Sequence, residues 1–142
     1  MSHEIKTIGL IGLGAVGALY AERLLSTGAD IRVIVDEARK ARYEREGVLV
    51  NGKRIDYPYA TPAQAEALDL IIVATKQGGL EAALDTISGF VGENTLLISL
   101  INGVTSEGAM AERFGEKNVL YAVAQGMDAV RRATASCMSI RA

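Results

Sequence analysis

Three glycines near the start of the chain have the spacing of a turn that binds phosphate. Gly12, Gly14 and Gly17 form a Gly-x-Gly-x-x-Gly pattern between an apolar run and a stretch with helical spacing. In such a turn the first glycine allows a tight bend, the second lets a pyrophosphate approach the backbone, and the third lets helix and strand pack closely. The free N–H groups and the positive end of the helix dipole then face the phosphates. The pattern predicts a dinucleotide-binding turn, and the alternative is a glycine-rich turn without a ligand.

An acidic residue is expected about 20 positions further on, at the end of the second strand. Asp36 lies there, 19 residues after Gly17. A carboxylate in this place accepts a hydrogen bond from a free ribose 2′-hydroxyl and favours NAD, whereas a guanidinium can hold the 2′-phosphate of NADP. Arg39 and Arg42 follow within two turns, so both cofactors stay open. The alternative for these arginines is a solvated helix with i,i+3 and i,i+4 ion pairs, which we favour for Arg45.

Two polar residues follow apolar strands at the edge where parallel sheets bind their ligands. Lys76 comes directly after the run LIIVAT (70–75), and Asn102 follows LLISLI (96–101). A lysine supplies positive charge to a carboxylate or a phosphate, and an asparagine amide offers a donor and an acceptor to a ribose or a keto acid. The alternatives, which these residues alone leave open, are a surface lysine and an ordinary Asn-Gly turn.

The elements that must position these residues alternate between strands and helices. Apolar runs predict strands over 5–11, 31–35, 70–74, 95–100 and 119–123. Helical spacing predicts helices over 15–27, 37–46, 63–67, 76–91 and 104–114, and Gly28 is expected to end the first of them. Asn51-Gly52 predicts a hairpin between 48–50 and 55–59. This order predicts an α/β fold of the Rossmann type, a doubly wound and mostly parallel sheet.

Length and composition bound the class of protein. The chain has 142 residues, 49% of them hydrophobic, which predicts one ordinary core and one domain. A net charge of −2 favours neither a nucleic-acid partner nor an acidic membrane. No run is apolar and long enough for a membrane span, no secretion signal is evident, and no cysteine spacing predicts a metal site. With Cys137 as its single cysteine, the chain is expected to act in the cytoplasm.

The motifs together resemble the ketopantoate reductases (2-dehydropantoate 2-reductases). GLGAVG (12–17), VATK (73–76), LINGVTSE (100–107) and VLYAVAQG (119–126) occur in the order typical of that family, and the resemblance runs from residue 5 to 131. It implies an NADPH-dependent oxidoreductase that reduces a small 2-keto acid, ketopantoate, on the route to pantothenate. NADP is therefore the expected cofactor and NAD the alternative, since Asp36 stands where many members carry a basic residue.

The resemblance also implies which residues contact the cofactor. Gly12, Gly14 and Gly17 would hold the pyrophosphate, while Lys76 and Asn102 would lie at the nicotinamide and substrate end. Glu107 matches the acidic residue of the motif but receives no chemical role. The full set of expected cofactor contacts is Gly12, Leu13, Gly14, Ala15, Val16, Gly17, Asp36, Arg39, Thr75, Lys76 and Asn102.

The family has a second, helical domain that supplies a lysine as general acid, and nothing in this chain resembles it. We therefore expect a dinucleotide-binding domain over 1–131 without a complete catalytic set, and with weak activity or none. The tail 132–142 departs from the family, and restoring one base near residue 132 yields a family-like segment. We expect a shift of the reading frame there, so that Cys137 and the tail have no selected function. The face that meets the second domain would be exposed and favour a homo-oligomer.

Two other functions were weighed against this one. A lone domain of this type can act as a non-catalytic module that senses NAD(H), which Asp36 and the chain length would suit but VATK and LINGVTSE do not. A methyltransferase also uses a glycine-rich turn, but the full three-glycine spacing and the Asn-Gly motif disfavour it.

Overall fold

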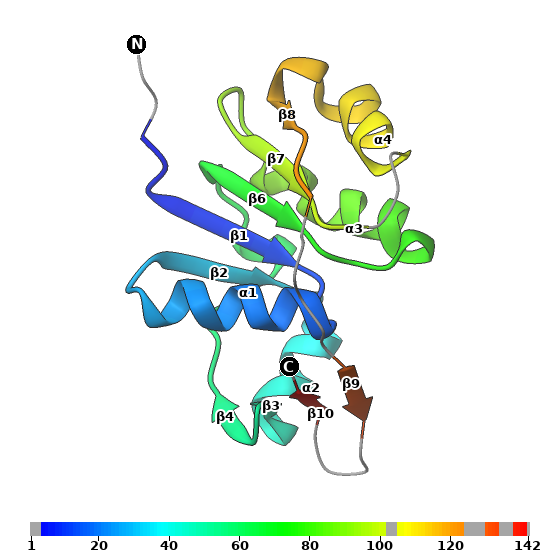
Figure 1. Ribbon diagram of the computed structural model, residues 1–142. Helices are drawn as coiled ribbons and strands as arrows, with labels where there is room; N and C mark the ends of the chain where they lie inside the picture. The colour runs from blue at the N-terminus through cyan, green and yellow to red at the C-terminus, as the bar shows by residue number, and fades with distance from the viewer. Residues whose placement is uncertain (1–3, 102–104, 124–129, 134–137, 142) are drawn as a thin grey trace.

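The computed structural model describes residues 4–101, 105–123, 130–133 and 138–141, and its main feature is a six-stranded parallel sheet (Figure 1). The strands of this sheet, in spatial order, are β5 (Tyr59–Ala60), β2 (Asp30–Ile34), β1 (Thr7–Ile11), β6 (Leu70–Val73), β7 (Leu96–Ser99) and β8 (Val119–Leu120). Numbered along the chain, the order is 3-2-1-4-5-6, which is that of doubly wound dinucleotide-binding folds. The predicted fold class is confirmed.

Among the described residues, four α-helices accompany the sheet: α1 (Ala15–Ser26), α2 (Glu37–Glu46), α3 (Leu80–Ile87) and α4 (Thr105–Phe114). Side chains alternate between two apolar clusters, one on each face of the sheet. Leu10 and Ile72 belong to the cluster that includes Ala18 of α1, whereas Ile11 and Val73 belong to the cluster that includes residues of α3 and α4. Because both faces are covered, the central strand β6 is apolar throughout, as its sequence run indicates.

Glycines end the helices where the sequence places them. Gly28 has φ +82°, and the amides of Gly28 and Ala29 bond back to the carbonyls of Leu25 and Leu24, which closes α1 in a Schellman motif. Gly115 has φ +102° directly after α4. Helix α1 runs unbroken from the glycine turn to Ser26, and its amino-terminal end lies close to the carboxyl end of β1 (Figure 1).

Two predicted helices are shorter than expected. The helix predicted over 63–67 is a single 3₁₀ turn at Pro62–Gln64, because the backbone is already extended at Ala65. The helix predicted over 76–91 consists of a 3₁₀ turn at Gln77–Gly79, α3, and a further 3₁₀ turn at Ser88–Phe90. Gly78 and Gly79 have poor helix propensity and delay the start of α3.

The predicted hairpin forms and also begins a second sheet. β3 (Val48–Val50) pairs antiparallel with β4 (Lys53–Ile55), and the turn has φ +52° at Asn51 and +82° at Gly52, as a type I′ turn requires. The rest of the predicted strand 55–59 separates from the hairpin and contributes β5 to the main sheet. The strand predicted over 119–123 is paired only as β8.

Two strands near the carboxyl end were not predicted. β10 (Met138–Arg141) pairs in parallel with β3 and antiparallel with β9 (Val130–Ala133), which gives a second sheet of order β4-β3-β10-β9. In Figure 1 these strands lie below α1, beside α2. Within the described residues, no helix has the length and apolar character needed to cross a membrane.

Candidate dinucleotide-binding site

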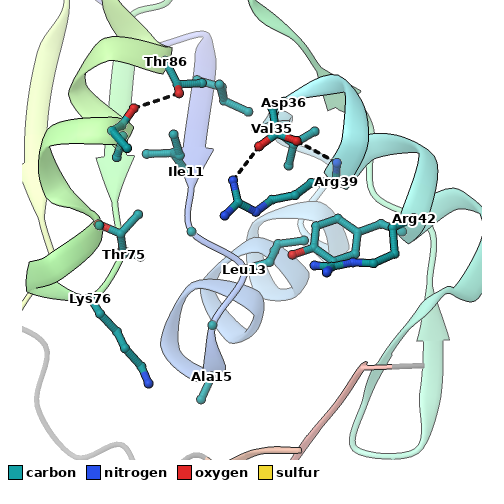
Figure 2. Close-up of a pocket in the computed structure, with 18 residues that line it drawn as sticks. Ile11, Leu13, Ala15, Val35, Asp36, Arg39, Arg42, Thr75, Lys76 and Thr86 are labelled. Atoms are coloured by element: carbon teal, nitrogen blue, oxygen red, sulfur yellow. Dashed lines mark hydrogen bonds and ion pairs between the residues drawn. The ribbon is translucent and has the colours of Figure 1, made fainter. Parts of the chain in front are cut away.

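A cavity of about 500 Å³ opens at the carboxyl ends of β1, β2 and β6. This is the point where the strand order reverses, and open α/β sheets bind ligands there. Figure 2 shows the glycine turn at the centre, with Asp36 and Arg39 on one side and Thr75 and Lys76 on the other. The lining residues are Ile11, Gly12, Leu13, Gly14, Ala15, Ile34, Val35, Asp36, Arg39, Arg42, Tyr43, Ala74, Thr75, Lys76, Gly79, Ala82, Ala83 and Thr86.

Packing within the protein itself requires two of the three motif glycines. Gly12 has φ +106°, and a Cβ placed there would lie 2.6 Å from the carbonyl carbon of Ala74. A Cβ on Gly17 would lie 1.8 Å from the carbonyl oxygen of Gly12 and 3.2 Å from the Cβ of Ala74. These glycines allow β1, α1 and the end of β6 to pack in direct contact, as the sequence pattern predicts.

Gly14 is different, because neither its backbone nor its neighbours require a glycine. Its φ is −81° and its ψ −167°, which any residue adopts, and a Cβ there would meet no atom within 4 Å. The open space lies in the cavity, at the first turn of α1, whose initial N–H groups have no partners within the helix. A small residue at this position leaves room for a ligand to approach the backbone.

Asp36 and Arg39 form a closed pair at the end of β2. Asp36 is the N-cap of α2: its Oδ1 accepts a hydrogen bond from the backbone N–H of Arg39 at 2.7 Å, and its Oδ2 accepts one from Nη1 of Arg39 at 2.5 Å (Figure 2). Arg42 lies over the ring of Tyr43, with 5.0 Å between its guanidinium carbon and the ring centroid. The i,i+3 ion pair anticipated as one alternative for Arg39 is therefore present, within the cavity wall.

The opposite side of the cavity is formed by the residues that follow β6. Lys76 is exposed, and its side chain extends away from Asp36 (Figure 2). The side-chain oxygen of Thr75 is buried and, among the described residues, has no hydrogen-bond partner. The two sides thus differ in charge: a carboxylate paired with a guanidinium on one, an ammonium group on the other.

The cavity brings together eight of the eleven residues expected to contact a cofactor. Val16 and Gly17 belong to α1 and do not line it. Asn102 lies outside the described residues. Ala82, Ala83 and Thr86 of α3 and Tyr43 of α2 also line the cavity, although no sequence motif pointed to them. The α3 residues could have been expected from their position in the fold, because the helix after β6 must begin at the same edge of the sheet as the glycine turn.

Glu107 is buried in a hydrogen-bonded chain that joins β7 to α4. Its Oε2 accepts from the hydroxyl of Ser106 at 3.1 Å, and the Ser106 and Ser99 hydroxyls are 2.8 Å apart. Since Ser106 donates to Glu107, Ser99 donates to Ser106, and Ser99 in turn accepts from the N–H of Ile101 at 3.1 Å. This chain connects the residues on both sides of 102–104, the segment in which the sequence analysis placed Asn102.

Tyr43, Tyr57 and Tyr59 form an aromatic cluster beside α1. The hydroxyl of Tyr57 donates to the carbonyl oxygen of Ala18 at 2.9 Å, one residue beyond Gly17. The ring of Tyr59 stacks on Tyr43, with centroids 5.9 Å apart, and meets Tyr57 edge-on. Burial, and then the neighbouring Tyr59, raises the pKa of Tyr57; burial, and then Tyr43, raises the pKa of Tyr59. In the folded protein both phenols therefore stay protonated at a pH at which a phenol exposed to water would ionise.

These features fit an extended anionic ligand with a sugar at one end. The open backbone at Gly14 suits a phosphate, and the Asp36 carboxylate suits sugar hydroxyls. Among the described residues no group of three or more His, Cys, Asp or Glu side chains is arranged to hold a metal ion.

The profile of the family described as ketopantoate reductase PanE/ApbA matches residues 8–136. The 2-dehydropantoate 2-reductase of Streptococcus pyogenes serotype M1 is 28% identical over 120 residues, which are 80% of this chain and 39% of the relative. That of Aquifex aeolicus is 27% identical over 115 residues, 78% of this chain and 36% of the relative. The chain thus spans about two-fifths of the length of these curated relatives.

Solved structures share the fold. The 2-dehydropantoate 2-reductase of Geobacter metallireducens GS-15 matches with a TM-score of 0.69 and 21% identity, over 96% of this chain and 46% of that one. A D-mandelate dehydrogenase, solved with NADH and anilino(oxo)acetate, matches with a TM-score of 0.74 and 23% identity, over 94% of this chain and 45% of that one. With its doubly wound sheet, its glycine turn and the family profile over most of its length, the chain belongs to the ketopantoate reductase family.

Proposed function

We propose that this chain is the dinucleotide-binding domain of a nicotinamide-dependent reductase of 2-keto acids, with 2-dehydropantoate as the substrate of the whole protein. The cofactor is NADP(H) or NAD(H). The family profile and the relatives support the class of reaction. Because the chain spans about two-fifths of those relatives, the activity, the substrate and the cofactor remain proposals for the whole protein.

The open space at Gly14 carries the proposal. A glycine that neither backbone conformation nor packing explains is accounted for by a ligand that needs the room. The dinucleotide pyrophosphate is the group that approaches the backbone at this point of such a turn. The free N–H groups of the first turn of α1 then hold its oxygens, and the dipole of a helix of 12 residues adds to the attraction.

The chain's other residues would orient the ligand along the cavity. Asp36 accepts hydrogen bonds from the adenosine ribose, and the ammonium group of Lys76 offers positive charge to an anionic group at the other end. The bound cofactor would supply the hydride. Reduction of a keto group leaves an alkoxide that must be protonated, a task that general-acid catalysis accelerates by roughly 10²–10⁴-fold. The resemblance assigns this acid to the part of the relatives beyond the matched region.

The test is calorimetric titration of the purified chain with NADPH and with NADH. We expect micromolar binding of at least one of them. Gly14→Ala should weaken it about tenfold, or about 1.4 kcal/mol, because the new Cβ occupies the space of the phosphate, while the fold stays intact.

Gly108→Ala is the matched control. It makes the same change in α4, also with nothing within 4 Å, but away from the lining of the cavity. Its affinity should equal that of the wild type. Binding of neither dinucleotide by the wild type, or equal binding by the Gly14 variant, contradicts the proposal.

A keto-acid titration separates a reductase domain from a sensing module. The chain is titrated with the dinucleotide in the presence and absence of 2-dehydropantoate, and a change in cofactor affinity shows that binding of the keto acid is coupled to binding of the cofactor. Dinucleotide binding that is indifferent to the keto acid would favour the NAD(H)-sensing alternative.

The shift of reading frame near residue 132 stays a prediction, and so does action in the cytoplasm. Sequencing the coding DNA tests the first: an uninterrupted frame with no family-like continuation in another frame would contradict it.

Self-association belongs to the same proposal. Leu120, Tyr121 and Val123 are apolar and 42%, 75% and 80% exposed, and exposed apolar groups of this kind favour assembly.

A further inference from the structure

We propose that Asp36 selects NAD(H) over NADP(H) in this chain, by neutralising the charge of Arg39 and by repelling a 2′-phosphate. The inference rests on the proposed function, because it concerns the ribose end of the same cavity. It departs from the NADP expectation of the family resemblance because of the contacts that Asp36, Arg39 and Arg42 make.

The Asp36 carboxylate lies in the cavity wall with half of its side chain accessible. Its exposed fraction is 46%, although both oxygens accept hydrogen bonds from Arg39. A carboxylate has about four lone-pair sites, and Arg39 uses two of them. The remaining sites can accept from ribose hydroxyls without disturbing the pair. An unmodified ribose is therefore bound by the site as it stands.

The same site disfavours a ribose that carries a 2′-phosphate. The phosphate carries a charge of about −1.5 to −2 near neutral pH and offers acceptors, so it has no proton to donate to Asp36. The guanidinium of Arg39 donates one N–H of Nη1 to the Oδ2 of Asp36 at 2.5 Å, and its remaining N–H groups are free to reach a phosphate. A phosphate held by them would lie beside the Asp36 carboxylate, which already neutralises Arg39, and two like charges in contact disfavour binding strongly.

Arg42 does not remove this difference. Its guanidinium lies over the ring of Tyr43, at 5.0 Å from the centroid, and Tyr43 is itself stacked on Tyr59. Moving Arg42 toward a phosphate would give up this contact. In Figure 2 Arg39 lies between Arg42 and Asp36. On this side of the cavity the Asp36 carboxylate is therefore the group that determines which ribose is accepted.

The decisive experiment measures the dissociation constants of NADH and NADPH for three proteins by calorimetry. The wild type should bind NADH at least about tenfold more tightly. Asp36→Asn keeps the shape and remains a good N-cap, but removes the charge and releases Arg39. It should weaken NADH and strengthen NADPH, so that the ratio of the two constants shifts about 100-fold toward NADPH. Adding Arg39→Ala to this variant should abolish the gain for NADPH.

Glu37→Gln is the matched control. It removes the same charge one residue away, in the first turn of α2 but outside the cavity lining, and should leave the ratio unchanged. Equal or tighter binding of NADPH by the wild type, or an unchanged ratio in Asp36→Asn, overturns the selection by Asp36 and leaves the proposed function standing. Binding of neither dinucleotide overturns both. Circular dichroism of each variant shows that the ratios compare folded proteins.

Discussion

At the scale of single residues, the motif glycines divide into one that opens on the cavity and two that hold the fold. Gly17 belongs to the second group, since a Cβ there would overlap the carbonyl oxygen of Gly12 at 1.8 Å. The two backbones would have to separate, and the contact between α1 and β6 would be lost.

We expect Gly17→Ala to lower the free energy of unfolding by about 3 kcal/mol, at the upper end of the usual cost of overpacking. Gly14→Ala should cost less than about 1 kcal/mol, because Gly14 is the N-cap of α1, where glycine is preferred over alanine. Urea unfolding followed by circular dichroism compares the two variants with the wild type. A loss of similar size in both would contradict the division of roles.

These residues could be selected from the sequence because each has a local physical reason. Spacing alone identifies Gly12, Gly14 and Gly17, and the distance along the chain identifies Asp36. The sequence does not show whether Arg39 pairs with Asp36 or is free to bind a ligand. The reason is that the N-cap of α2 and the ion pair both depend on side-chain conformations. Val16 lies in α1 away from the cavity lining, although its position within the motif suggested a contact.

At the scale of elements, Tyr57 connects the segment after the hairpin to α1. Its hydroxyl bonds the carbonyl oxygen of Ala18 at 2.9 Å in a buried setting. Tyr57→Phe should cost about 1 kcal/mol of unfolding free energy, the usual net value of one such bond. Tyr121→Phe, at a site with 75% exposure, is the control and should cost nothing measurable.

The raised pKa of Tyr57 also predicts a dependence on pH. Above about pH 10, the ordinary pKa of a phenol, Tyr57 ionises in the unfolded chain but stays protonated in the folded one. The unfolded state then binds fewer protons, so stability falls as pH rises. Urea unfolding between about pH 9 and pH 11 should show a steeper loss in the wild type than in Tyr57→Phe. Parallel slopes would contradict this assignment.

Element prediction failed where short segments lack strong local signals. The run 63–67 contains three alanines but begins after Pro62 and ends in extended backbone, so it forms only a turn. The stretch 76–91 has helical spacing from Leu80 to Ile87, and α3 has those bounds. Its flanks have glycines in place of good helix formers, and the backbone tightens into 3₁₀ turns there.

At the scale of the whole molecule, exposed apolar residues beside the sheet edge predict self-association. Leu120, Tyr121 and Val123 follow one another at the end of β8. We expect light scattering after size exclusion to give a mass that rises with protein concentration. Tyr121→Lys combined with Val123→Lys should reduce it to that of a monomer. Ile5→Lys, before β1 and 44% exposed, is the control and should leave the assembly unchanged.

Of the second sheet only the hairpin was predicted, because the pairing of β10 with β3 joins distant parts of the chain. β10 pairs with β3 across some 90 residues of sequence, Met138 opposite Val48. Each strand is short, and its composition does not indicate which strand it pairs with. The main sheet was predictable because its helices and strands alternate and parallel connections have few allowed arrangements.

The aromatic composition of the chain gives the site an optical reporter. The protein has five tyrosines and no tryptophan, so its ultraviolet emission comes from tyrosine alone. Tyr43 lines the cavity, and Tyr59 stacks on it at 5.9 Å. Reduced nicotinamide absorbs near the wavelengths at which tyrosine emits, so a bound reduced dinucleotide would quench this emission by energy transfer. Occupancy of the cavity can thus be followed by light in the unlabelled protein, at concentrations too low for calorimetry.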